Sequence, residues 1–213
     1  MKTRKFLVAG GNSTMLVWDC PVDQRKMVSL KMLESVEQVG FIETGETPRL
    51  VMMGNELCIN ATIAFAHILE GDGKLQTSGL DSPVDFENTD NKTTIHLPIQ
   101  YTKQGNVVLL SGIGFECSNG TENIGKDYVS ALAEKYHMPA FGVAQFEGNK
   151  LTPWVYVKET DSLVKETACG SGSIAVSLTT GQDEIVQPTG ESIFVRDNGN
   201  VILVSAKVTE LEV

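Results

Sequence analysis

Two short segments of the sequence match each other position by position in residue type, and this repeat constrains the fold more than any other feature. Residues 58–66 read Cys-Ile-Asn-Ala-Thr-Ile-Ala-Phe-Ala, and residues 169–177 read Cys-Gly-Ser-Gly-Ser-Ile-Ala-Val-Ser. The two cysteines lie 111 residues apart, about half of the chain. A duplicated domain or half-barrel is the economical explanation of such a repeat.

Both segments read as helices that are apolar almost all round, which predicts burial inside a wrapper of strands. We expect strands at 5–9, 14–18, 36–43, 49–53, within 74–110, and at 141–147, 154–158, 192–195 and 201–208, with surface helices at 22–34 and 123–137. The sequence therefore predicts an α+β protein of two pseudo-symmetric halves, residues 1–98 and 99–213. Each half is expected to be an antiparallel-rich sheet wrapped around a central helix, and the chain end is free to cross back to the first half.

Charge and composition exclude several classes of partner. Seventeen basic and 27 acidic side chains give a net charge of −10, which repels phosphate backbones and anionic lipids, so we expect neither nucleic acid nor a membrane as partner. The start of the chain has too short an apolar stretch for a signal peptide, which favours a cytoplasmic protein with reduced thiols. The three histidines, His67, His96 and His137, are too scattered for a metal site. A homodimer remains an open alternative.

The paired cysteines carry the chemical hypothesis. A helix N-terminus presents unpaired N–H groups and a partial positive charge, which bind carboxylates and are expected to lower the pKa of a nearby thiol. If the two halves face each other, the thiols of Cys58 and Cys169 flank one small anionic substrate. A thiolate on one face could then remove a proton from carbon while a thiol on the other face returns one, without any cofactor. The alternative is that both cysteines are inert packing residues, and their matched positions weaken it.

At this point the sequence resembles the cofactor-independent two-cysteine racemases and epimerases of the diaminopimelate epimerase superfamily. The segment 10–12, Gly-Gly-Asn, is similar to the family's N-terminal Gly-Asn turn, and 58–66 and 166–173 are similar to its two cysteine motifs. The resemblance implies Cys58 and Cys169 as the catalytic pair. It also implies a substrate contact at Asn12, together with the residues that follow each cysteine: Ile59, Asn60, Gly170 and Ser171.

Departures from the family pattern bear on the substrate. The arginine that grips the distal carboxylate in diaminopimelate epimerases has no match, since no arginine occurs between Arg49 and Arg196. The opening Gly-Gly-Asn-Ser-Thr and the segment 187–190, Gln-Pro-Thr-Gly, are closer to the histidine racemase branch. A free amino acid, histidine first, is therefore the expected small-molecule partner. Diaminopimelate epimerase and a non-catalytic binding or thiol redox protein of the same fold remain the alternatives.

Two glutamates could bind the ammonium group of such a substrate. A zwitterionic ligand needs an anion opposite the helix ends, and Glu159 and Glu166 precede the second cysteine closely. The alternative for each is a solvated surface carboxylate.

Overall fold

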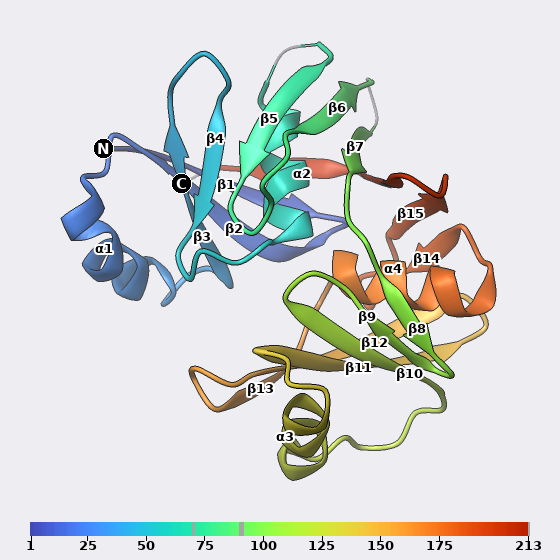
Figure 1. Ribbon diagram of the computed structural model, residues 1–213. Helices are drawn as coiled ribbons and strands as arrows, with labels where there is room; N and C mark the ends of the chain where they lie inside the picture. Colours follow the sequence, from blue (N-terminus) through green and yellow to red (C-terminus); the bar gives the residue numbers. More distant parts are fainter. Residues whose placement is uncertain (70, 90–91, 213) are drawn as a thin grey trace.

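The computed structural model describes residues 1–69, 71–89 and 92–212, and it is a mixed α/β structure made mostly of strands (Figure 1). Its first part contains β1 (Lys2–Val8), β2 (Gly11–Trp18), the 3-10 turn η1 (Val22–Gln24), α1 (Arg25–Met32), β3 (Gln38–Glu43), β4 (Arg49–Met52), α2 (Ile59–His67), β5 (Gly73–Thr77), β6 (Val84–Asn88) and β7 (Thr93–Leu97). The rest contains β8 (Thr102–Gln104), β9 (Val107–Leu109), β10 (Ile113–Asn119), α3 (Lys126–Lys135), β11 (Ala140–Glu147), β12 (Lys150–Val157), β13 (Ser162–Lys165), α4 (Gly170–Thr180), β14 (Glu184–Val186), β15 (Ser192–Asp197), β16 (Ile202–Ala206) and β17 (Val208–Leu211).

Strand pairing runs through the whole molecule. In the first part, β1 pairs antiparallel with β2, β2 parallel with β3, and β3 antiparallel with β4. In the second part, β9 pairs antiparallel with β10, β10 parallel with β11, and β11 antiparallel with β12. The two parts are joined where β16 pairs antiparallel with β7, and β17 returns to pair with β1.

Helices α2 and α4 are buried among these strands. All residues from Ile59 to Ala66 are buried in α2, which contacts β1, β2, β6, β7 and β17. Helix α4 contacts β9, β10, β11, β12, β14 and β15. One apolar cluster contains side chains of both helices, such as Ile63, Phe65 and Ile174. Each of these large side chains contributes roughly 1.5–3 kcal/mol by leaving water, so the core holds both helix starts in place.

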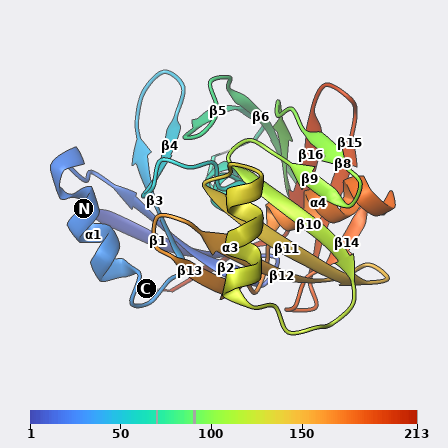
Figure 2. The same cartoon turned by 60° about the horizontal axis from the view of Figure 1, so that its bottom comes forward.

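Helices α1 and α3 lie on the outside. Helix α3 contacts β11, β12 and β13, and Figure 2 shows it in front of these strands. The helix expected at 123–137 begins only at Lys126, because Gly125 is still extended and forms its N-cap. The helix expected at 22–34 begins as the short turn η1 and ends at Met32. Of the helices in the described ranges, none combines the length and apolar character that crossing a bilayer requires.

Candidate active site

Cys58 is the N-cap residue of α2, and its sulfur takes the place that a serine or aspartate oxygen usually has. The amide N–H of Ala61 donates to Cys58 Sγ at 3.3 Å, and the thiol itself donates to Gln38 Oε1 at 2.6 Å. The hydroxyl of Thr62 donates to the Cys58 carbonyl at 2.7 Å. Gln38 lies on β3, so a strand and a helix together fix a half-buried thiol.

Cys169 has the same position on α4. The N–H of Gly172 donates to Cys169 Sγ at 3.2 Å, and the hydroxyl of Ser173 donates to the Cys169 carbonyl at 2.7 Å. The Glu166 carboxyl group acts on Cys169 and raises the pKa of its thiol. Cys169 is 5% exposed, so this thiol is more deeply enclosed than that of Cys58.

Asn60 connects the two helix starts. Its Oδ1 accepts the Gly170 N–H at 2.9 Å, and its Nδ2 donates to the Ala168 carbonyl at 3.1 Å. A Cβ at Gly170 would lie 2.6 Å from Ile59 Cγ2, so only glycine permits this approach. A charge on Cys58 also acts on Cys169 and raises its pKa. The starts of α2 and α4 therefore contact each other.

The turn before Asn12 reaches the second motif. Asn12 is 2% exposed and has a left-handed backbone, with φ of 48°. Its N–H donates to Thr167 Oγ1 at 2.9 Å, and a Cβ at Gly11 would lie 2.6 Å from that same oxygen. Within the described part of the chain, Asn12 Oδ1 is buried without a hydrogen-bond partner. This amide oxygen is an acceptor available to a ligand.

Glu166 is partly buried beside Cys169. Burial, and then the charge of Glu37, raise its pKa to about 7, while the hydrogen bond from Cys169 opposes the shift. A carboxyl group with this pKa exchanges a proton readily near neutral pH. Glu166 thus interacts with Cys169, which its expected role with a substrate ammonium did not include.

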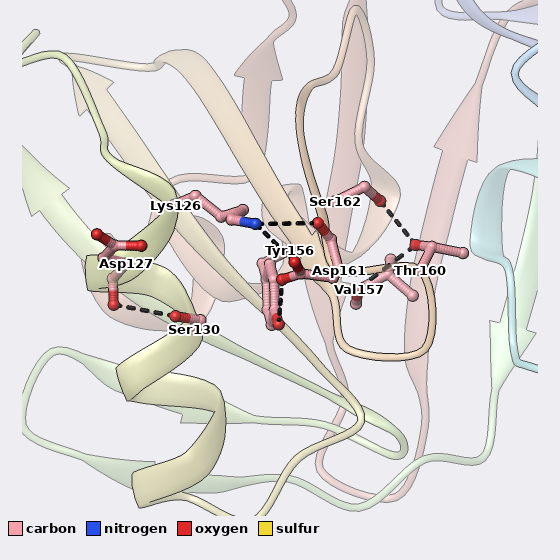
Figure 3. Close-up of polar contacts among 8 residues, drawn as sticks. All are labelled: Lys126, Asp127, Ser130, Tyr156, Val157, Thr160, Asp161 and Ser162. Atoms are coloured by element: carbon pink, nitrogen blue, oxygen red, sulfur yellow. Dashed lines mark hydrogen bonds and ion pairs between the residues drawn. The ribbon is translucent and has the colours of Figure 1, made fainter.

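Glu159 is exposed, on the turn between β12 and β13. Figure 3 shows how this turn is held: Lys126 Nζ lies 2.7 Å from Asp161 Oδ2, and the Tyr156 hydroxyl donates to Asp161 Oδ1 at 3.1 Å. The charge of Glu159 contributes to the raised pKa of Glu56, after burial as the main cause. Glu159 therefore acts on the residues just before α2, whereas Glu166 acts on both thiols. Ser171 is half-buried in the first turn of α4.

The expected lowering of the thiol pKa values is wrong for this structure. Burial raises the pKa of Cys58 to about 12, with the charges of Glu56 and Glu166 adding to the shift, although the backbone N–H groups at the helix start lower it. Burial and the Glu166 carboxylate raise the pKa of Cys169 well above its usual value. Loss of hydration outweighs the helix N-terminus, because the charged thiolate is the form that burial penalises.

Sequence reasoning missed several residues that contact the helix starts. Gln38 gives one signal, since it is a polar residue opening the otherwise apolar stretch Gln-Val-Gly-Phe-Ile. Gln187 lies in a segment that carries the resemblance, yet no role was assigned to it; its Oε1 accepts the Cys169 N–H at 2.9 Å. Thr167 also lies in such a segment, 166–173, whereas Glu37 gives no signal. The residues that the structure describes contain no cluster of three or more His, Cys, Asp or Glu that could hold a metal ion.

The sequence is similar to those of known histidine racemases. The family model for the histidine racemase CntK N-terminal domain matches residues 9–111. A histidine racemase of Fusobacterium nucleatum is 30% identical, covering 91% of this chain and 88% of that protein. A histidine racemase of Staphylococcus aureus is 24% identical, covering 80% of this chain and 74% of that protein.

Solved structures share the fold. A predicted epimerase from Pseudomonas aeruginosa superposes with a TM-score of 0.72 at 10% identity, covering 99% of this chain and 98% of that one. A phenazine biosynthesis PhzC/PhzF protein from Clostridium difficile gives 0.66 at 12% identity, covering 98% and 97%. At these identities the likeness concerns the fold alone. The sequence relatives carry the assignment further: this chain belongs to the histidine racemase family and is an amino-acid racemase.

Proposed function

We propose that the substrate is histidine and that Cys58 and Cys169 invert its α-carbon from opposite faces. The observation that carries this proposal is the pair of N-cap thiols, joined through Asn60 and electrostatically coupled. The names of the sequence relatives support histidine as the substrate.

The reaction divides into two proton transfers. One thiolate takes the α-proton, so that the C–H bond breaks, an S–H bond forms, and the electron pair remains on the substrate. The thiol on the opposite face then gives its proton to the α-carbon and becomes a thiolate. Glu166 prepares Cys169 by accepting its proton; the raised pKa of Glu166 and the effect of the two groups on each other's pKa support this role.

The developing charge needs stabilisation at the substrate carboxylate. The first turn of a helix carries unpaired N–H groups and a partial positive charge, and we assign the substrate carboxylate to the N–H groups of Ile59 and Ser171, at the starts of α2 and α4. Asn12 Oδ1 and the nearby glutamates supply acceptors for the substrate ammonium. No cofactor takes part in the mechanism as we propose it.

The lining of the site also bears on the side chain of the substrate. Glu37, Glu56 and Glu166 act electrostatically on the thiols or on one another. A second substrate carboxylate would be repelled here and would lack a bidentate arginine partner. A neutral or weakly basic imidazole fits this surrounding better, which favours histidine over diaminopimelate.

We further infer that two pseudo-symmetric halves with central helices α2 and α4 bring the thiols together. Two features support this inference: α1 connects the parallel pair β2 and β3, and α3 connects the parallel pair β10 and β11. Because a parallel pair needs a crossover connection, each surface helix has the same topological role in its half.

The test is α-proton exchange and inversion in deuterated water. L- and D-histidine, neutral amino acids and LL-diaminopimelate are incubated under the same conditions, then followed by NMR and chiral chromatography. Histidine should exchange and invert fastest, and the double variant Cys58→Ser/Cys169→Ser serves as the control for non-enzymatic exchange. Faster turnover of diaminopimelate, or none of any amino acid, would contradict the proposal.

A further inference from the structure

The buried amide of Gln187 holds the backbone of Cys169 from outside its helix. Gln187 follows β14 and is 3% exposed. Its Oε1 accepts the Cys169 N–H at 2.9 Å, while its Nε2 donates to Ser173 Oγ and to the Ile185 carbonyl, both at 2.9 Å. Since Ser173 Oγ in turn donates to the Cys169 carbonyl, Gln187 and Ser173 together fix both polar backbone groups of Cys169.

The turn that carries Gln187 is itself fixed, and it reaches a second part of the site. The N–H of Gln187 donates to the Glu191 carbonyl at 2.8 Å, and Gly190 closes the turn with φ of 87°, a conformation that favours glycine. The hydroxyl of Thr189 donates to the Ala9 carbonyl at 2.6 Å, close to the turn before Asn12. One short segment therefore connects the second helix start with the Gly-Asn turn.

The first half uses a different arrangement around its cysteine. There Thr62 donates to the Cys58 carbonyl, and its hydroxyl lies 3.2 Å from that of Thr77. In the second half, the side chain of Gln187 bonds to the Cys169 N–H as well as to Ser173, so the backbone of Cys169 is held more firmly than that of Cys58.

We propose that Gln187 is a positioning residue, which aims the Cys169 thiol at the substrate by holding the N–H of Cys169. The inference rests on the two-thiol reaction proposed above. Rotating the N-cap backbone displaces the sulfur from the α-carbon, and a displacement of about 1 Å can lower turnover about 10²-fold. Cys58 keeps its own contacts, so removal of the α-proton from its face continues.

The variant Gln187→Met tests this role, because methionine has similar length but neither accepts from Cys169 nor donates to Ser173. We expect kcat for inversion to fall about 10²-fold while KM changes much less. For the enantiomer deprotonated by Cys58, the ratio of α-proton exchange to inversion should rise. A merely structural role for Gln187 would leave that ratio unchanged.

Gln145→Met is the matched control. Gln145 is also 3% exposed, and its amide donates to the Glu122 carbonyl at 2.7 Å and accepts from the Trp154 indole at 3.2 Å, bonds that involve neither cysteine. This variant should keep the wild-type kcat and the wild-type ratio of exchange to inversion. Equal losses of kcat in Gln187→Met and Gln145→Met, with the ratio of exchange to inversion unchanged, would overturn the positioning role.

A second measurement does not depend on turnover. The rate of iodoacetamide alkylation, followed by peptide mass spectrometry, should change several-fold at Cys169 relative to Cys58 in Gln187→Met but not in Gln145→Met. If the wild type turned over no amino acid, the proposed function would fail, and this alkylation ratio would still decide the role of Gln187. Should Gln187→Met not fold, Gln187→Asn keeps a buried amide but is too short to accept from the Cys169 N–H, and an unchanged alkylation ratio there would overturn the role.

Discussion

Cys58 and Cys169 have the same position on their helices but different partners. The half-buried thiol of Cys58 donates to the neutral amide of Gln38, whereas the pKa of the enclosed Cys169 thiol is raised by the carboxyl group of Glu166. A neutral amide can orient a thiol but cannot take its proton. A carboxyl group with a pKa of about 7 can do both. The comparison teaches that the repeat supplies two equivalent sulfur positions, while the neighbours make them chemically unequal.

The largest expected effect comes from removing either sulfur. Cys58→Ser and Cys169→Ser should each lower racemisation about 10⁴-fold, because an alkoxide is far less available than a thiolate near neutral pH. Each variant should still exchange the α-proton of one enantiomer only, and the two variants should exchange opposite enantiomers. Chiral chromatography combined with NMR in deuterated water measures both quantities. Exchange of the same enantiomer by both variants would contradict the claim that the two thiols act on opposite faces of the substrate.

The variant Glu166→Gln tests whether the carboxyl group near Cys169 has a role that the amide of Gln38 cannot have for Cys58. The pKa of Glu166 is raised from 4.5 to about 7, so the folded protein holds this proton more tightly than the unfolded chain. Its contribution to the free energy of unfolding is therefore complete below about pH 4.5 and is lost as pH rises to about 7, a change on the order of 3 kcal/mol. The difference in stability between wild type and variant, from urea unfolding at pH 5 to 8, should show this loss.

The same variant has a catalytic consequence. Turnover of the wild type should rise with pH through about 7 as Glu166 becomes able to accept a proton, and Glu166→Gln should lower kcat about 10²-fold. Activity and stability thus change in opposite directions over this interval. A variant with wild-type kcat would remove Glu166 from the mechanism, even if the difference in stability were observed.

The smallest effect is expected at Gln38. Gln38→Leu removes the acceptor of the Cys58 thiol, and the loss of one such hydrogen bond is worth roughly 1 kcal/mol, or about fivefold in kcat. Gln38→Glu should have a different effect, since a carboxylate here would give Cys58 the kind of partner that Cys169 has. Steady-state kinetics of the two variants would sharpen the comparison. A loss in Gln38→Leu as large as in Glu166→Gln would mean that the two partners are equivalent.

The sequence identified the two sulfurs but not their surroundings. Matching residue types across the repeat is enough to pair Cys58 with Cys169, and an apolar run is enough to predict that α2 is buried. Contacts between residues far apart in the sequence cannot be predicted in this way, because they depend on strand register and on turns. Gln38 comes 20 residues before Cys58, and only the folded chain brings the two side chains together.

The pKa values of the thiols show a second limit of prediction from the sequence. A helix start can be read from the sequence, and its lowering of the pKa is present at Cys58. The extent of burial at that helix start depends on packing from both halves, and here burial changes the thiol pKa more than the helix start does. Among the glutamates, spacing alone could not separate Glu166, which contacts Cys169, from Glu159, which lies on an exposed turn.

The pairing of β17 with β1 has a consequence for folding. Lys5 lies opposite Leu211, so β1 pairs with a strand 206 positions further along the sequence. Such distant pairing slows folding, because a long loop must close first. The racemase is therefore expected to gain activity only after this pairing has formed, and the segment around Cys58 alone should not be active.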